Sequence, residues 1–106
     1  MDITADQLPN PTFPLSLGQV VVTKSLWCTL ASAADDATTL RRIAALLEQH
    51  RRGDWGDLDP DDVASNDQAA VDGGRLLSAY VCHGTRVWII TEADRSVTTV
   101  LLPEDY

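Results

Sequence analysis

The last third of the chain alternates short hydrophobic runs with turn residues, as β-sheet sequences do. Three runs, 75–82, 86–92 and 97–103, are rich in β-branched, aromatic and other hydrophobic residues. The first two are joined by His83-Gly84-Thr85, which is typical of a β-hairpin connection. Consecutive strands with such short connections predict an antiparallel meander.

The middle of the chain has the spacing of helices instead. Leu40, Ile43, Ala44 and Leu47 recur every three or four residues, which predicts a helix that starts at Asp35 or Asp36, buries these residues and stops at Gly53. Two further helices are predicted from their end signals. One is short and capped by Ser25, and the other runs from Asp59-Pro60 to Gly73-Gly74.

The order of these elements predicts the fold class. Residues 19–23, QVVVT, form a further β-branched run ahead of the helices. We therefore expect an α+β fold: an antiparallel sheet of three C-terminal strands plus an N-terminal edge strand, with two to three helices packed on one face. Residues 1–17 contain three prolines and are predicted to form an N-terminal arm, which leaves residues 18–106 as a single domain.

The charge balance limits the classes of partner. The 106 residues include 16 acidic and 8 basic side chains, for a formal net charge of −8. Direct binding to nucleic acid or to an anionic membrane needs the opposite sign, whereas a strongly basic protein would be attracted. Because the sequence shows no signal-peptide pattern and only two cysteines, Cys28 and Cys82, we predict a cytoplasmic protein with reduced thiols.

Negative charge is concentrated in residues 53–74, which we call the acidic segment. It has no Lys or Arg and contains seven aspartates: Asp54, Asp57, Asp59, Asp61, Asp62, Asp67 and Asp72. Part of this charge has a local explanation, because acids in the first turn of a helix interact favourably with the helix dipole. The basic residues just before the segment, Arg51 and Arg52, are also placed to neutralise part of it.

Metal binding and thiol chemistry are alternative functions for the acidic, cysteine and histidine residues. Asp57, Asp59 and Asp61 match the first, third and fifth positions of an EF-hand loop, but Asp62 stands where the turn glycine belongs and Gln68 where the bidentate glutamate belongs. The two cysteines and the two histidines, His50 and His83, lack the spacing of zinc ligands. We predict no catalytic residue, no cofactor and no metal site.

Several motifs resemble those of a family of small acidic bacterial proteins carried on plasmids, phages and integrative elements. They are GDWGDLD at 53–59, Asn66-Asp67, GRLLSAY at 74–80 and WIITEADRSVTTVLLPEDY from Trp88. The resemblance covers residues 53–106 and brings no active-site residue with it. It implies a mobile-element setting, in which small acidic proteins inhibit host restriction or CRISPR machinery.

Our leading hypothesis is a non-enzymatic interaction protein that acts as a DNA mimic. The acidic segment would occupy the basic, nucleic-acid-binding surface of a host defence protein (CRISPR or restriction) or of a DNA-processing protein. Trp55 and Leu58 would add apolar contacts. The predicted partner-binding residues are Asp54, Trp55, Asp57, Leu58, Asp59, Asp61, Asp62 and Asp67.

Two alternatives belong to other classes. A small enzyme or ligand-binding domain would have its site between the acidic segment and the sheet, formed by Trp55, Asp57, Tyr80 and Arg95. A homo-oligomer would form through an exposed strand edge, which needs only unpaired backbone groups. Trp55 also has a structural interpretation, as the anchor that holds the loop around it.

Overall fold

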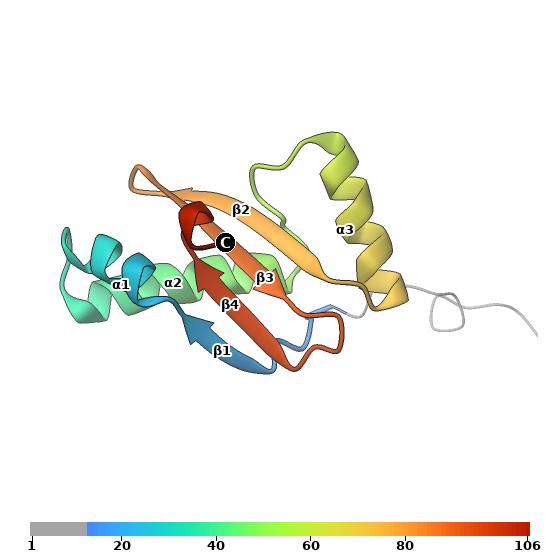
Figure 1. The fold of residues 1–106 in the computed structure, drawn as a ribbon, viewed down its shortest axis with the longest axis horizontal. Helices are drawn as coiled ribbons and strands as arrows, with labels where there is room; N and C mark the ends of the chain where they lie inside the picture. The colour runs from blue at the N-terminus through green and yellow to red at the C-terminus, as the bar shows by residue number, and fades with distance from the viewer. Residues whose placement is uncertain (1–12) are drawn as a thin grey trace, which may run out of the picture.

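The computed structural model describes residues 13–106, which form the predicted series of helices and strands (Figure 1). The strands are β1 (Gln19–Val22), β2 (Leu76–Cys82), β3 (Thr85–Thr91) and β4 (Val97–Leu101). The helices are α1 (Lys24–Ala31), α2 (Asp36–Arg51), α3 (Pro60–Asp72) and the C-terminal 3-10 turn η2 (Pro103–Asp105). Most of the predicted arm, residues 1–12, lies outside the described residues.

The four strands form one mixed sheet in the order β1-β4-β3-β2. Strands β2, β3 and β4 are the predicted antiparallel meander, and β1 is the predicted edge strand. β1 runs parallel to β4, with Gln19 opposite Val97 and Val22 opposite Val100. A parallel edge is possible because three helices separate β1 from the meander, which gives the chain the length that a crossover needs.

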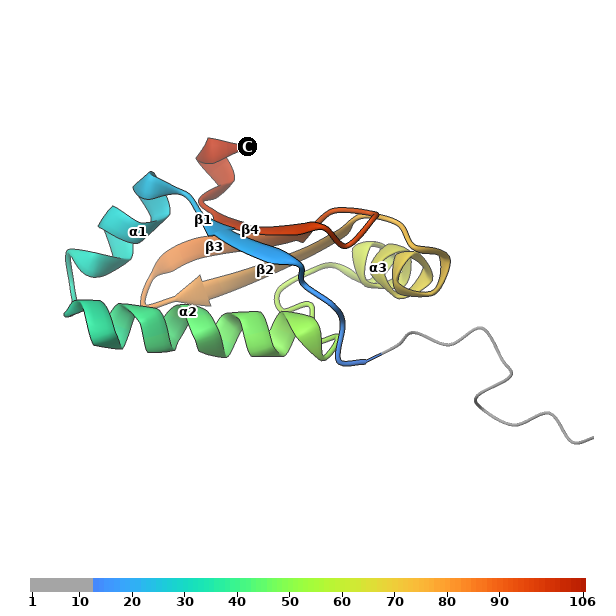
Figure 2. The ribbon, with the colours of Figure 1, turned by 90° about the horizontal axis from the view of Figure 1, so that it is seen from below.

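One face of the sheet is covered by helices and the other is open apart from the C-terminal turn. Figure 1 looks onto the open face, and Figure 2 shows α2 running along the opposite face. Residues of α1 and α2 pack there against inward-facing strand residues. The principal buried residues are Leu26, Leu30, Ile43, Leu46, Tyr80, Val87, Ile89 and Val100.

The buried face of α2 differs from the predicted one. Leu40 is 58% exposed and Ala44 is exposed, so two of the four predicted positions face solvent. The buried residues of α2 are Thr39, Ile43, Leu46 and His50. The buried face is rotated relative to the predicted one because its polar residues find hydrogen-bond partners within the protein. Thr39 donates its hydroxyl hydrogen to the Asp35 carbonyl at 2.9 Å, and His50 has partners on the sheet.

Two of the three helices have the N-terminal cap that the sequence predicts. Asp35 caps α2 by accepting the Thr38 amide at 2.7 Å, and Asp59 caps α3 by accepting the Asp62 amide at 2.9 Å. The cap of α1 is Thr23 and not Ser25. The Ser25 hydroxyl instead donates to the Asp105 carboxylate at 2.6 Å and ties α1 to the C-terminal turn.

Candidate functional site

The acidic segment begins as a loop attached to the free edge of β2. The Asp57 amide donates to the Ala79 carbonyl at 2.6 Å, and the Ala79 amide donates to the Trp55 carbonyl at 3.1 Å. Gly56 lies between them with φ of 76°, and a Cβ at this position would stand 2.1 Å from the Ala79 oxygen. Glycine is therefore required for the loop to approach the strand this closely.

Helix α3 completes the cover of the same edge. Figure 1 shows α3 beside β2, on the side of the sheet opposite to β1. The side-chain amide of the buried Asn66 pairs with the β2 backbone as a neighbouring strand would. Its Nδ2 donates to the Leu77 carbonyl at 2.5 Å, and its Oδ1 accepts the Leu77 amide at 3.2 Å. Sequence reasoning gave Asn66 no structural role. The sequence signal for this role is that Asn66 lies on the same helix face as Val63 and Ala70.

Trp55 anchors the segment and is not displayed to a partner. Its side chain is 4% exposed, and its indole nitrogen donates to the Asp67 carboxylate at 2.9 Å. It packs with Leu15 and Leu76, and its ring meets His50 edge-on at 5.7 Å between centroids. Leu58 is half-buried against the same cluster. Little of Trp55 is therefore exposed to a partner, and its predicted role as the loop anchor is confirmed.

Three of the predicted partner-binding aspartates are used within the fold. Asp54 accepts the Gln49 side-chain amide at 2.9 Å and the Gly56 backbone amide at 3.2 Å. Asp59 is the cap of α3, and Asp67 accepts the Trp55 indole hydrogen. All three residues remain on the surface, so their charge still contributes to the field outside the molecule.

The other three, Asp57, Asp61 and Asp62, are exposed around the start of α3. Within residues 13–106, no hydrogen bond or ion pair engages their carboxylates. The basic end of α2 does not neutralise them, because Arg51 and Arg52 both pair with Glu48, at 2.8 and 2.5 Å. Hydrogen bonds from Arg52 and then Arg51 lower the pKa of Glu48. The start of α3 thus carries uncompensated negative charge.

The alternative site between the acidic segment and the sheet is not assembled. Tyr80 lies in the interface, where its hydroxyl donates to the Asp54 carbonyl at 2.5 Å and burial raises its pKa to about 12. Arg95 is directed elsewhere and donates to the Gly74 and Ala69 carbonyls at 2.6 and 3.1 Å. The two residues serve separate structural contacts, and Gly56 of the segment forms a β-bridge with Ala79 of the sheet.

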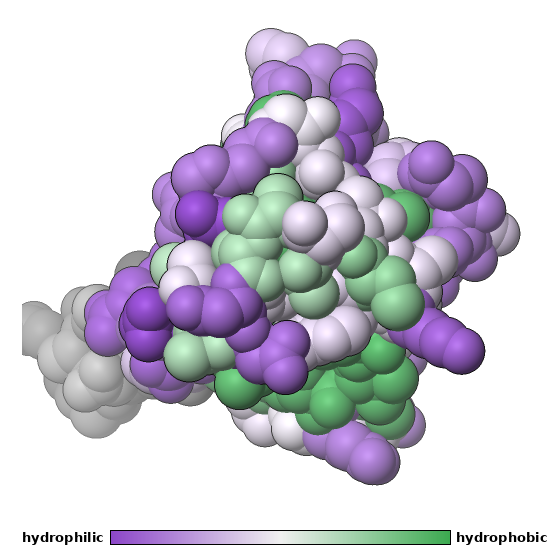
Figure 3. All heavy atoms as spheres, turned by 90° about the vertical axis from the view of Figure 1, so that its left-hand side faces the viewer, coloured by the Kyte–Doolittle hydropathy of each residue, from purple (hydrophilic) through white to green (hydrophobic). Residues whose placement is uncertain are grey.

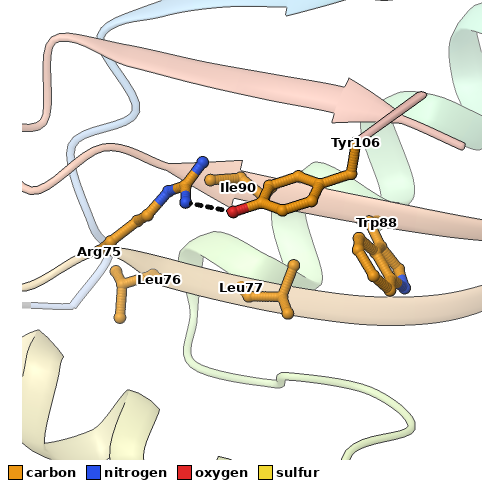
Figure 4. Close-up of a pocket in the computed structure, with 6 residues that line it drawn as sticks. All are labelled: Arg75, Leu76, Leu77, Trp88, Ile90 and Tyr106. Atoms are coloured by element: carbon orange, nitrogen blue, oxygen red, sulfur yellow. Dashed lines mark hydrogen bonds between the residues drawn. The ribbon is translucent and has the colours of Figure 1, made fainter. Parts of the chain in front are cut away.

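A cavity of about 260 Å³ lies on the open face of the sheet, where sequence reasoning predicted nothing. In Figure 4 the Tyr106 ring extends over it, with Trp88 and Ile90 of β3 and Leu77 of β2 around it. Arg75 donates to the Tyr106 hydroxyl at 2.7 Å and pairs with Glu92 at 3.4 Å. The lining is therefore mainly apolar, and its one charged group already has two partners among the described residues.

Residues 13–106 contain no group of three or more His, Cys, Asp or Glu side chains arranged to hold a metal ion. Cys28 is exposed on α1 and Cys82 is buried in β2. None of the helices in the same range combines the length and the apolar character that crossing a membrane requires. Comparison of the chain with family models, curated protein sequences and solved structures gives no match.

Proposed function

We propose that this chain is a non-enzymatic acidic interaction protein from a mobile element. It inhibits a host defence protein (CRISPR or restriction) or a DNA-processing protein by occupying the basic surface that normally binds nucleic acid. The contact surface is the outer side of the acidic segment. Asp57, Asp61 and Asp62 are its principal charges, and Asp54, Asp59 and Asp67 contribute beside them.

One observation carries the proposal. Within the acidic segment, the groups that attach it to the sheet are different from the carboxylates that face solvent. Trp55, Asn66 and the backbone at Asp57 fix the segment to the β2 edge. The carboxylates of Asp57, Asp61 and Asp62 then face solvent without a cation beside them in the described chain. Had the arginines of α2 paired with these carboxylates, the surface would have had little charge to offer a partner.

The physical mechanism is electrostatic competition with phosphate. A negative surface held in place accelerates encounter with a basic partner, by 10- to 1000-fold in well-steered complexes. Because the loop is already ordered, little conformational entropy is lost when it binds. The charges are exposed, so binding should weaken as added salt shortens the screening length. The four-residue pocket of Trp55, Asp57, Tyr80 and Arg95 is not favoured, since Tyr80 and Arg95 are engaged in separate contacts.

The test measures protection of incoming DNA. Cells that carry one restriction or CRISPR system are transformed with a plasmid that the system targets, with and without expression of the chain. We expect expression to raise transformation in at least one system. The purified effector from that system should then lose DNA binding in the presence of the chain, and increasing salt should restore DNA binding.

Two double variants with the same change in net charge distinguish the effect of the acidic segment from the effect of overall charge. The first, Asp57→Lys with Asp61→Lys, alters the acidic segment, and we expect it to abolish protection. The control, Asp36→Lys with Glu104→Lys, changes exposed acids elsewhere and should retain protection. Equal behaviour of the two variants, or no protection by the wild-type chain in any system, would refute the proposal.

A further inference from the structure

The two edge strands of the sheet, β2 and β1, differ in how their outer edges are covered. The β2 edge is covered by the backbone of the acidic segment and by the Asn66 amide. The β1 edge has no such cover from residues 13–106, because β1 is the terminal strand and pairs with β4 alone. Natural proteins usually protect a free edge with charge, proline, a bulge or a covering element.

β1 is a short strand of four residues, but it has no charge, proline or bulge to protect its edge. Its sequence is QVVV, without a charged residue or a proline, and its pairing with β4 is regular. Val20 and Val21 are each 41% exposed. Figure 3 views the molecule from the left-hand side of Figure 1. It shows a strongly hydrophobic area low on that side, at the level where β1 lies in Figure 1. The strand therefore combines exposed apolar side chains with an open backbone.

The hydrogen bonds to β4 show which backbone groups are open. Gln19 donates to the Ser96 carbonyl at 2.9 Å, and Thr23 donates to the Val100 carbonyl at 3.0 Å. Backbone groups alternate in direction along a strand, so Gln19, Val21 and Thr23 face β4. The amide and carbonyl groups of Val20 and Val22 face outward, away from the sheet.

We propose that a second copy of this chain pairs with β1, so that two sheets join into one of eight strands. The strands run antiparallel about a two-fold axis at Val21. Val20 then lies opposite the partner's Val22, and each such pair exchanges two hydrogen bonds. The dimer therefore satisfies the four outward-facing amides of Val20 and Val22 in the two chains.

A second copy fits this edge better than an unrelated strand because the pairing is self-complementary. In the same register Gln19 lies opposite the partner's Thr23, a polar pair, and the valines lie opposite valines. The paired strand, Gln19–Val22, has no charged residue, so no like charges meet in it. A two-fold contact of this kind places the same patch on both sides and closes as a dimer.

The distribution of charge also favours this edge. The acidic segment lies beyond β2, at the opposite side of the sheet from β1. In the dimer, seven strand spacings separate the two β2 strands, or roughly 34 Å at about 4.8 Å per spacing. This is more than three times the screening length of about 10 Å at 0.1 M salt. The two acidic segments therefore repel one another little and point in opposite directions.

The experiment compares the association of three full-length proteins by sedimentation velocity from micromolar to millimolar concentration. We expect the wild-type chain to pass from monomer to dimer as concentration rises. Val21→Lys should weaken dimerisation at least tenfold. Val81→Lys changes the valine of β2, which is 60% exposed, and should leave dimerisation unchanged. Thermal unfolding of each variant checks that the lysine leaves the fold intact.

Two direct readouts identify the contact itself. Hydrogen exchange at the Val20 and Val22 amides should slow as protein concentration rises, while exchange at Val21 stays slow throughout. In a Cys28→Ser background, Val21→Cys should form an intermolecular disulfide with oxidised glutathione, because Cα atoms in such a pair are about 4.5 Å apart. Val81→Cys should not. A wild-type monomer at every concentration, or a dimer that Val81→Lys disrupts and Val21→Lys does not, would overturn the proposal.

Discussion

The stability of this protein should fall as pH decreases from neutral, because one histidine is buried in its neutral form. His50 is fully buried between α2 and the sheet. Its Nδ1 lies 2.5 Å from the Ser78 hydroxyl, and its Nε2 lies 2.8 Å from the Thr91 hydroxyl. Thr91 in turn contacts Thr98 at 2.8 Å, so the ring belongs to a connected polar network within the core.

The size of the effect follows from the pKa of His50. Burial, and secondly the positive charge of Arg95, lower this pKa from 6.5 to about 4. The unfolded chain takes up a proton near pH 6.5, whereas the folded chain does so only near pH 4. Stability from the neutral ring is therefore complete above pH 6.5 and is lost as pH falls toward 4. At 1.36 kcal/mol for each tenfold change in proton affinity, the loss by pH 4 is about 3 kcal/mol.

The assay is urea unfolding followed by tryptophan fluorescence, at intervals of about half a pH unit from 7.5 to 4.5. The comparison protein is His50→Gln, which lowers stability but removes the titrating ring. Asp35, Glu48, Asp94 and Asp105 have lowered pKa values because of their hydrogen bonds, and they act in both proteins at lower pH. The difference between the two stability curves therefore reports on His50.

We expect the wild-type free energy of unfolding to fall by about 2.5 kcal/mol more than that of His50→Gln between pH 7.5 and 4.5. Most of this difference should appear between pH 6.5 and 5, above the range in which carboxylates titrate. Parallel curves for the two proteins would show that His50 is not held neutral by burial. Higher wild-type stability at pH 5 than at pH 7.5 would refute the same reasoning.

Two further predictions concern the packing of the helices. Asn66→Ala leaves the Leu77 amide and carbonyl groups without their side-chain partner, and should cost about 2–4 kcal/mol in urea unfolding, whereas Gln68→Ala on the exposed face of α3 should cost less than about 0.5. Equal losses would show that the amide pairing contributes nothing. Leu46→Ala should cost about 2–5 kcal/mol and Leu40→Ala less than about 1, and the reverse order would mean that α2 presents the other face to the sheet.

The sequence predicted the elements of this fold because their signals are local. The strands β2 and β3 were identified from their composition and from the glycine turn between them, and α3 from the Asp59-Pro60 start and the glycines at its end. The order of the elements then predicted the meander and the edge position of β1. Each inference needs only neighbouring residues and the rules of chain connection.

The polar interior was decided by tertiary structure, because its partners are far apart in the sequence. His50 and Thr39 interrupt the hydrophobic pattern of α2, so a stripe of Leu40, Ile43, Ala44 and Leu47 looked more regular. His50 can be buried only because Ser78 and Thr91, 28 and 41 residues away, meet its ring nitrogens. Asn66 likewise gains its role only when α3 comes to rest beside Leu77.

The same distinction applies to the acidic segment. The sequence determined how much negative charge residues 53–74 carry, because composition alone sets that quantity. Which carboxylates are used within the fold and which face solvent depended on the position of other elements. Asp67 is held by Trp55, and the arginines of α2 turn to Glu48, so Asp57, Asp61 and Asp62 are left on the surface. Ion pairs and hydrogen bonds act over a few ångströms, and only the folded chain brings distant residues that close.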